Sequence, residues 1–182
     1  MDFDFSAILD DDLKAHTVVE TPTKENSQNE QSQMTTFCTF WRTKSMMSVL
    51  YNKDKILFKF MLGKGETPQN NNYLKESKVF FQLNKEELFK LINDISTLIA
   101  SLKTQNPKQV QLIHEIKEGE LKKFDIYPAK DNNSFFVNLK YKNANYSINM
   151  NLADMKFFLF VLKMILYEIY TGTRVGFTYN WI

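Results

Sequence analysis

Two eight-residue stretches, FQLNKEEL at residues 81–88 and INMNLADM at residues 148–155, follow one pattern 67 positions apart. Each begins with alternating apolar and polar residues, continues with an asparagine, and has an acidic residue three places later. The alternation is typical of a strand, and the spaced asparagine and acidic residue are typical of a helix start. The sequence therefore predicts two similar units, each with a strand that leads into a helix.

Strand-like segments lie upstream of both stretches and are separated by polar or glycine-containing turns. In the first unit they lie at residues 35–42, 45–52, 56–62 and 78–83. In the second unit they lie at residues 109–117, 121–129, 134–142 and 145–150. This order predicts an α+β fold of two tandem ββββα repeats, at about residues 35–104 and 109–171. Each repeat is expected to be an antiparallel four-stranded sheet with one helix packed on one face.

The two expected helices differ in their apolar surface. After Asn84, leucines and isoleucines recur at helical spacing with charged residues opposite them, which is typical of an amphipathic helix. The second helix, expected at residues 152–170, is apolar nearly all round. Such a helix must be covered on more than one side. We therefore predict a subunit interface on the second helix and a homo-oligomer, with a tetramer favoured.

The charge is unevenly distributed along the chain, although the net charge is only +2. Residues 1–33 hold eight acidic and two basic residues, a charge of −6, so residues 34–182 hold 21 basic and 13 acidic residues, a charge of +8. Residues 20–33 contain no large apolar side chain and are expected to be a disordered linker. The acidic tail and linker at 1–33 have three open interpretations: a competitor for the basic domain at 34–182, a recruiter of replication proteins, or a solubilising tail.

The cysteine content and the apolar pattern are evidence on the cellular compartment in which the protein acts. Cys38 is the single cysteine, which excludes an internal disulfide framework and a cysteine-based zinc site within one chain. No basic and apolar run typical of a secretory signal opens the sequence. The longest apolar stretch, at 157–170, is interrupted by Lys163 and Glu168 and is too short to span a bilayer. We expect an intracellular, reducing compartment, which for a viral protein is the host cytoplasm.

The ββββα-ββββα order across about residues 35–170 resembles the Whirly family of single-stranded DNA-binding proteins. It is also similar, unit by unit, to the ββββα transcriptional-coactivator fold and to the kinetoplastid guide-RNA-binding proteins. The Lys-Gly-Lys-Ala signature of the Whirly family is not in this sequence, and Gly63-Lys64-Gly65 is the nearest stretch. The resemblance implies splayed sheets, helices gathered at the centre of a tetramer, and single-stranded DNA that lies along the sheets.

Alternation along the strands separates a helix-facing side from an open side of each sheet. The open sides combine lysines, which neutralise phosphates, with amides and with aromatic rings on which bases stack. An ordinary solvated sheet face is the alternative interpretation of each of these residues. The predicted nucleic-acid-binding residues are Lys59, Lys123, Lys140, Asn138, Asn149, Gln82, Phe80, Phe136 and Tyr127.

The basic residues favour phosphate contact over base reading, because all but Arg42 and Arg174 of the 23 are lysine. An AT-rich genome would produce the same excess of lysine over arginine. No nucleophile-elbow, phosphate-loop or metal-spacing motif appears. His16 lies in the acidic tail, and His114 lies in an expected strand, where we interpret it as a core histidine. The sequence thus predicts no enzyme activity, no metal and no cofactor.

These observations predict a largely sequence-independent single-stranded DNA-binding protein that acts in DNA replication or recombination. RNA is an alternative ligand, because neither stacking nor phosphate contact excludes a 2′-hydroxyl. A different class of function is a structural or protein-interaction module, such as a viral or scaffold component, which would use the same sheets against protein and would bind no oligonucleotide.

Overall fold

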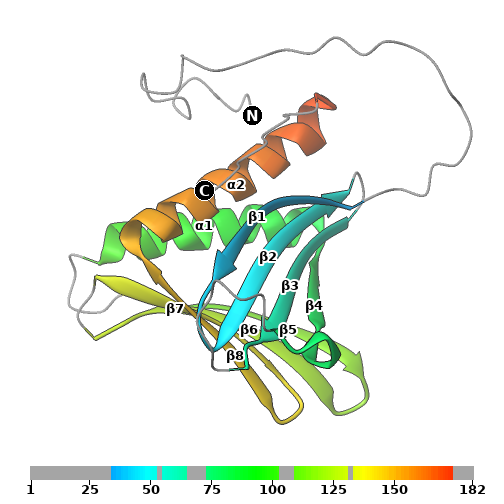
Figure 1. Cartoon of the computed structure of the whole chain (residues 1–182). Helices are drawn as coiled ribbons and strands as arrows, with labels where there is room; N and C mark the ends of the chain where they lie inside the picture. Colours follow the sequence, from blue (N-terminus) through cyan, green and yellow to red (C-terminus); the bar gives the residue numbers. More distant parts are fainter. Residues whose placement is uncertain (1–33, 53–54, 65–72, 103–108, 131–132, 174–182) are drawn as a thin grey trace, which may run out of the picture. The chain divides into compact units, whose positions relative to one another are not determined.

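The computed structural model describes residues 34–52, 55–64, 73–102, 109–130 and 133–173 (Figure 1). The expected acidic tail and linker at 1–33 lie outside the described residues, as do the tips of two expected turns at 53–54 and 131–132. The structural account that follows therefore concerns the double-repeat domain.

The described residues form two successive ββββα units, as the sequence predicted. The first unit consists of β1 (Thr35–Trp41), β2 (Ser45–Asn52), β3 (Lys55–Leu62), the short 3-10 helix η4 (Lys75–Ser77), β4 (Val79–Leu83) and α1 (Lys85–Ser101). The second unit consists of β5 (Val110–Lys117), β6 (Glu120–Pro128), β7 (Ser134–Tyr141), β8 (Ala144–Asn151) and α2 (Leu152–Thr171). The predicted fold class is confirmed.

Each unit contains its own antiparallel sheet, with neighbouring strands in chain order. The strand order is β1-β2-β3-β4 in the first sheet and β5-β6-β7-β8 in the second. Short turns join all consecutive strands within a sheet except β3 and β4, which residues 63–78 connect. The sheets are thus two separate meanders within one domain.

Both helices begin with a reciprocal capping box. The Asn84 side chain accepts a hydrogen bond from the Glu87 N–H at 2.8 Å, and the Glu87 carboxylate accepts one from the Asn84 N–H at 3.0 Å. Asn151 and Asp154 repeat this arrangement at the start of α2, at 2.8 and 3.2 Å. Each box satisfies backbone donors that the first helical turn leaves without partners.

One apolar core joins the two sheets to the helices. Phe58 of the first sheet lies with its ring centroid 5.4 Å from that of Phe124 in the second sheet and 5.5 Å from that of Phe158 in α2. All three rings are fully buried. In Figure 1, α1 and α2 lie side by side along one side of both sheets. The two sheets and α1 therefore supply much of the cover that the apolar helix α2 requires, and the subunit interface on α2 stays a prediction.

Two ion pairs cross between the repeats, and each holds the start of one helix. In the His114 clasp, His114 Nε2 of β5 lies 2.7 Å from Glu87 Oε1 in the capping box of α1. In the Arg42 clasp, Arg42 Nη2 lies 2.6 Å from Asp154 Oδ2 in the capping box of α2. A basic side chain that follows or lies in the first strand of each repeat thus binds the start of the helix of the other repeat.

The edges of the last strands, β4 and β8, are also bound by the opposite repeat. Arg42 Nε donates to the Asn149 carbonyl on β8 at 2.6 Å, and the Ser147 N–H of β8 lies 3.4 Å from Ser45 Oγ. On β4, the Phe80 carbonyl accepts a hydrogen bond from Lys122 Nζ at 2.9 Å. These contacts satisfy main-chain groups that an edge strand would otherwise expose.

Candidate nucleic-acid interface

The strand registers define an outer face on each sheet, opposite its buried rows. The first outer face has three cross-strand rows: Thr36, Leu50, Leu57 and Gln82; Thr39, Ser48, Lys59 and Phe80; and Trp41, Met46 and Met61. The second outer face has the rows Tyr127, Phe136 and Asn149; Gln111, Asp125, Asn138 and Ser147; and Ile113, Lys123, Lys140 and Asn145. The nine predicted site residues divide between these faces, because Lys59, Phe80 and Gln82 lie on the first and the other six on the second.

The predicted aromatic residues of the second outer face are direct neighbours. Tyr127 and Phe136 are cross-strand partners with ring centroids 5.6 Å apart, and Asn149 is the partner of Phe136 on β8. Tyr127 is 38% exposed and Phe136 is half-buried. The two rings form a small accessible surface on which a base can stack.

A carboxylate occupies the centre of the second outer face. Asp125 Oδ1 lies 3.6 Å from Lys123 Nζ and accepts hydrogen bonds from Gln111 at 2.9 Å and Gln109 at 3.3 Å. These neighbours cover it, so that Asp125 is only 2% exposed. Lys123 therefore already has a counter-charge, whereas its cross-strand partner Lys140 is exposed.

Asn138 has the predicted strand position but not the expected accessibility. It is the cross-strand partner of Asp125 and is only 2% exposed. Alternation along a strand predicts which side of the sheet a residue faces, but not how its longer neighbours fold over it. We therefore leave Asn138 out of the contact surface proposed below.

The predicted residue Phe80 of the first outer face has two lysines as neighbours. Lys59 and Phe80 are direct cross-strand partners, and Lys78 Nζ lies 5.6 Å from the centroid of the Phe80 ring. Burial lowers the pKa of the Lys59 ammonium, and the nearby charge of Lys78 lowers it further. Gln82 is exposed on the same strand. A phosphate near Lys59 would relieve this repulsion between the two ammonium groups.

Two aromatic residues of the first outer face were not predicted. Trp41 is 41% exposed, and its ring centroid lies 5.3 Å from that of Tyr73. Alternation from the buried Phe40 would have placed Trp41 on the open side. Tyr73 lies in a polar segment outside the strands, so no periodicity could have indicated it.

A glycine allows the segment after β3 to lie against the β1–β2 turn. Gly63 pairs with Tyr73 in an isolated antiparallel bridge, and its N–H donates to the Lys44 carbonyl at 2.8 Å. A Cβ atom at position 63 would lie 2.2 Å from the Thr43 carbonyl oxygen. Only glycine fits this close contact between backbone segments. The Tyr73 hydroxyl then donates to the Arg42 carbonyl at 2.8 Å.

A separate charged cluster lies where β5 meets β6 and β7 meets β8. The Tyr141 hydroxyl donates to Glu120 Oε1 at 2.5 Å, and Lys117 Nζ lies 3.1 Å from Glu120 Oε2. These contacts, the Tyr141 hydrogen bond foremost, lower the pKa of Glu120 to about 2. Lys142 Nζ lies 3.5 Å from the same carboxylate, which raises the pKa of Lys142. The single carboxylate of Glu120 thus pairs with two lysines, and the cluster keeps a net positive charge.

The remaining candidate groups are structural. Cys38 is buried, and burial raises the pKa of its thiol to about 12. His114 is half-buried, with its ring stacked 4.2 Å from that of Phe81. Within the described residues, no three His, Cys, Asp or Glu side chains gather as a metal site would require. No described helix has the length and apolar content needed to cross a membrane.

Two tandem antiparallel meanders, each followed by a helix, define a Whirly-like fold. No family model matches the chain, and no curated protein matches it in sequence. Among solved structures, the plant transcriptional regulator PBF-2 superposes with a TM-score of 0.51 at 15% identity, over 82% of this chain and 90% of that one. WHY3 from Arabidopsis thaliana superposes with a TM-score of 0.49 at 14% identity, over 74% of this chain and 88% of that one. The resemblance predicted from the order of elements is thus confirmed for the fold.

Proposed function

We propose that this protein binds single-stranded DNA along the outer faces of its two sheets, largely without regard to sequence. The observation that carries the proposal is the pairing of rings with ammonium groups on open strands. On the first outer face, Phe80 has Lys59 as its cross-strand partner and Lys78 near its ring, and on the second Tyr127 and Phe136 are joined by the exposed Lys140. Lysines attract the phosphates, and rings stack under bases of any identity.

The fold supports the same proposal by analogy. The solved structure that superposes with a TM-score of 0.51 is that of a plant transcriptional regulator, and the Whirly family to which the fold is similar binds single-stranded DNA. Fold alone does not assign function, so the argument rests on the side chains of the two faces. Because most of the basic residues are lysine, we propose phosphate contact rather than base reading as the main attraction.

A titration of the full chain with fluorescent thirty-base oligothymidine tests the proposal. We expect binding that weakens steeply with salt, with a log-log slope of about −0.7 for each phosphate neutralised. Lys140→Gln and Phe136→Ala should each weaken binding. The exposed helix residues Lys90 and Phe89 provide the matched controls Lys90→Gln and Phe89→Ala, which should bind as the wild type does. Absence of binding at low salt would contradict the proposal and favour a protein-interaction module.

Two features of the ligand and the assembly extend the proposal. We propose DNA as the principal ligand, and a parallel titration with oligouridine measures the preference for RNA. We also propose that the protein is a homo-oligomer, with a tetramer favoured, because α2 is apolar nearly all round. Sedimentation at several protein concentrations would show a monomer if this part of the proposal is wrong.

The acidic residues 1–33 are proposed to regulate access to the faces or to recruit replication proteins. Their charge of −6 opposes the charge of +8 on residues 34–182. If the acidic residues compete with DNA, deletion of 1–33 should tighten binding and change its salt dependence. Unchanged affinity with an unchanged slope would exclude competition and leave recruitment or solubilisation. We place this activity in a reducing intracellular compartment and in DNA replication or recombination.

A further inference from the structure

The two outer faces differ in their charge balance. No residue in the three rows of the first outer face is acidic, and among the described residues neither Lys59 nor Lys78 has a carboxylate partner. On the second outer face, Asp125 lies centrally and pairs with Lys123 at 3.6 Å. A phosphate that approaches Lys123 must compete with this fixed carboxylate, whereas one that approaches Lys59 meets no such competitor.

The surface between the rings also differs. On the first outer face, the half-buried Leu50 and Leu57 lie in the row on one side of Phe80, and the half-buried Met61 lies in the Trp41 row on its other side, so that apolar surface flanks the Phe80 row. The Phe80 row itself adds Thr39, Ser48 and Lys59. On the second outer face, the central row carries two amides, a hydroxyl and the carboxylate, and no ring. Base faces pack more favourably on apolar and aromatic atoms than on hydrogen-bonding groups that must remain solvated.

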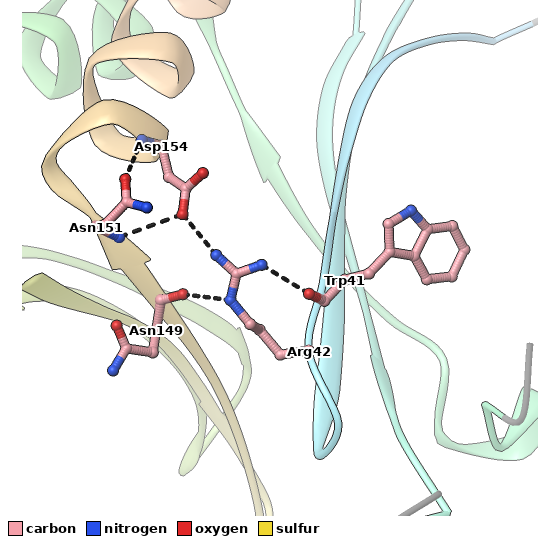
Figure 2. Close-up of polar contacts among 5 residues, drawn as sticks. All are labelled: Trp41, Arg42, Asn149, Asn151 and Asp154. Carbon is pink, nitrogen blue, oxygen red and sulfur yellow. Dashed lines mark hydrogen bonds and ion pairs between the residues drawn. The ribbon is translucent and has the colours of Figure 1, made fainter. Parts of the chain in front are cut away.

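The Trp41 end of the first face is held in place from both sides. Tyr73 packs against the indole ring and donates a hydrogen bond to the Arg42 carbonyl. Arg42 Nη1 donates to the Trp41 carbonyl at 2.7 Å while the same guanidinium binds Asp154 and the Asn149 carbonyl. Figure 2 shows the indole ring turned away from this network. A ring fixed before binding loses little conformational entropy when a base stacks on it.

The distance between Trp41 and Phe80 suits a short stretch of single-stranded DNA. Trp41 and Phe80 lie on the two edge strands of a four-stranded sheet and in neighbouring rows. A spacing of about 4.8 Å between strands and a rise of about 3.3 Å per residue place them roughly 16 Å apart. At a rise of about 3.4 Å per stacked nucleotide, that span corresponds to about five nucleotide steps. One strand that crosses the face can therefore reach both rings and Lys59.

We infer that the first outer face is the principal base-stacking site, with Trp41 and Phe80 as its two stacking residues, Tyr73 as the support of Trp41, and Lys59 and Lys78 as phosphate contacts. This inference rests on the proposed function and locates it. The second outer face contributes a weaker contact through Tyr127, Phe136 and Lys140.

The experiment compares matched variants of the full chain in titrations with fluorescent thirty-base oligothymidine. Trp41→Ala and Phe80→Ala should each weaken binding about tenfold, because stacking is worth about 1–3 kcal/mol per base. Tyr127→Ala should weaken binding by a smaller factor. Lys59→Gln should reduce the magnitude of the salt slope by about 0.7, because one phosphate contact is lost, and Lys123→Gln by less. Thermal unfolding of each variant verifies that it folds.

The outcomes separate the inference from the proposed function. If wild-type protein binds but Tyr127→Ala and Phe136→Ala weaken binding more than Trp41→Ala and Phe80→Ala, the inference is overturned and the proposed function stands. If wild-type protein does not bind oligothymidine or oligouridine, both are overturned. If Trp41→Ala fails to fold, Phe80→Ala and Lys59→Gln decide the question, because both substitutions lie on the open side of the sheet away from the Arg42 contacts.

Discussion

The starts of α1 and α2 are built alike but are held by different basic side chains. In each case the acidic residue of the capping box accepts a hydrogen bond from its own asparagine and pairs with the other repeat. Glu87 pairs with an imidazole, which is charged only when protonated, whereas Asp154 pairs with a guanidinium, which is always charged. The comparison shows that one geometry of reciprocal attachment is achieved with two different chemistries.

The two clasps also differ in what else they join. Arg42 forks to three acceptors and so connects the β1–β2 turn, the β8 edge and the first turn of α2. His114 binds one carboxylate but stacks on the buried ring of Phe81. The Arg42 clasp therefore depends on polar contacts at the surface, whereas the His114 clasp depends on the core below it.

The largest expected effect comes from removing the ring beneath the His114 clasp. Phe81 is fully buried and contacts both His114 and Phe124, so Phe81→Ala should destabilise the domain by about 3–5 kcal/mol. Urea unfolding monitored by circular dichroism measures this free energy. The counterpart 67 residues later is Ile148, also fully buried, where Ile148→Val should cost about 1 kcal/mol. A loss below about 1 kcal/mol for Phe81→Ala would contradict the core dependence of this clasp.

Removal of the guanidinium fork is expected to have the next largest effect. Arg42→Met retains an unbranched side chain but leaves Asp154 and the Asn149 carbonyl without this donor. Because these contacts are charge-assisted yet partly exposed, we expect a loss of about 2 kcal/mol in the free energy of unfolding. Arg42→Lys keeps the charge without the fork and should recover part of the loss. Full recovery by lysine would show that charge alone, and not the forked geometry, makes this clasp.

A smaller effect is expected from the His114–Glu87 pair itself. His114→Phe keeps a ring to stack on Phe81, and Glu87→Gln keeps the capping box, because glutamine serves in that position as well. A double-mutant cycle over these two substitutions should give a coupling of about 0.5–1 kcal/mol, measured near pH 6 by urea unfolding. A coupling near zero would show that stacking alone holds His114 in place.

The smallest effect is expected from Glu120. This residue belongs to an ion-pair cluster that lies within the second repeat, so it serves as a control for the two clasps between the repeats. The folded pKa of Glu120, about 2, lies below the ordinary glutamate value of 4.5, because Tyr141 and the nearby lysines favour the carboxylate. This contribution to stability is present above about pH 4.5 and is lost as the pH falls through about 2. The difference in stability between wild type and Glu120→Gln should therefore shrink over that window, as acid titration of unfolding measures. A difference that grows on acidification would contradict this sign.

The elements could be predicted from sequence because their determinants are local. Asn84 with Glu87 and Asn151 with Asp154 define the helix starts within four residues, and alternation placed Lys59 and Phe80 on one face of the first sheet. The capping boxes and the side of the sheet that each strand residue faces therefore needed no knowledge of the tertiary structure.

The contacts between repeats could not be predicted, because their partners are far apart in the chain. Arg42 and Asp154 are separated by 112 positions, and no periodicity relates them. The burial of Asn138 and of its cross-strand partner Asp125 is likewise a matter of side-chain packing, which alternation along a strand does not describe. Tyr73 lies in a polar segment, so only the tertiary structure brings it to Trp41.

In each repeat the last strand has main-chain atoms that the opposite repeat binds, those of Phe80, Ser147 and Asn149. These contacts have a consequence for self-association. Strands β4 and β8 cannot readily accept an incoming strand from another molecule. On β4 the incoming strand would first have to displace Lys122, and on β8 it would have to displace both Arg42 and Ser45. Open-ended polymerisation through the edge strands β4 and β8 is therefore disfavoured. Any continuous sheet shared between copies of the protein would have to be built through β1 or β5.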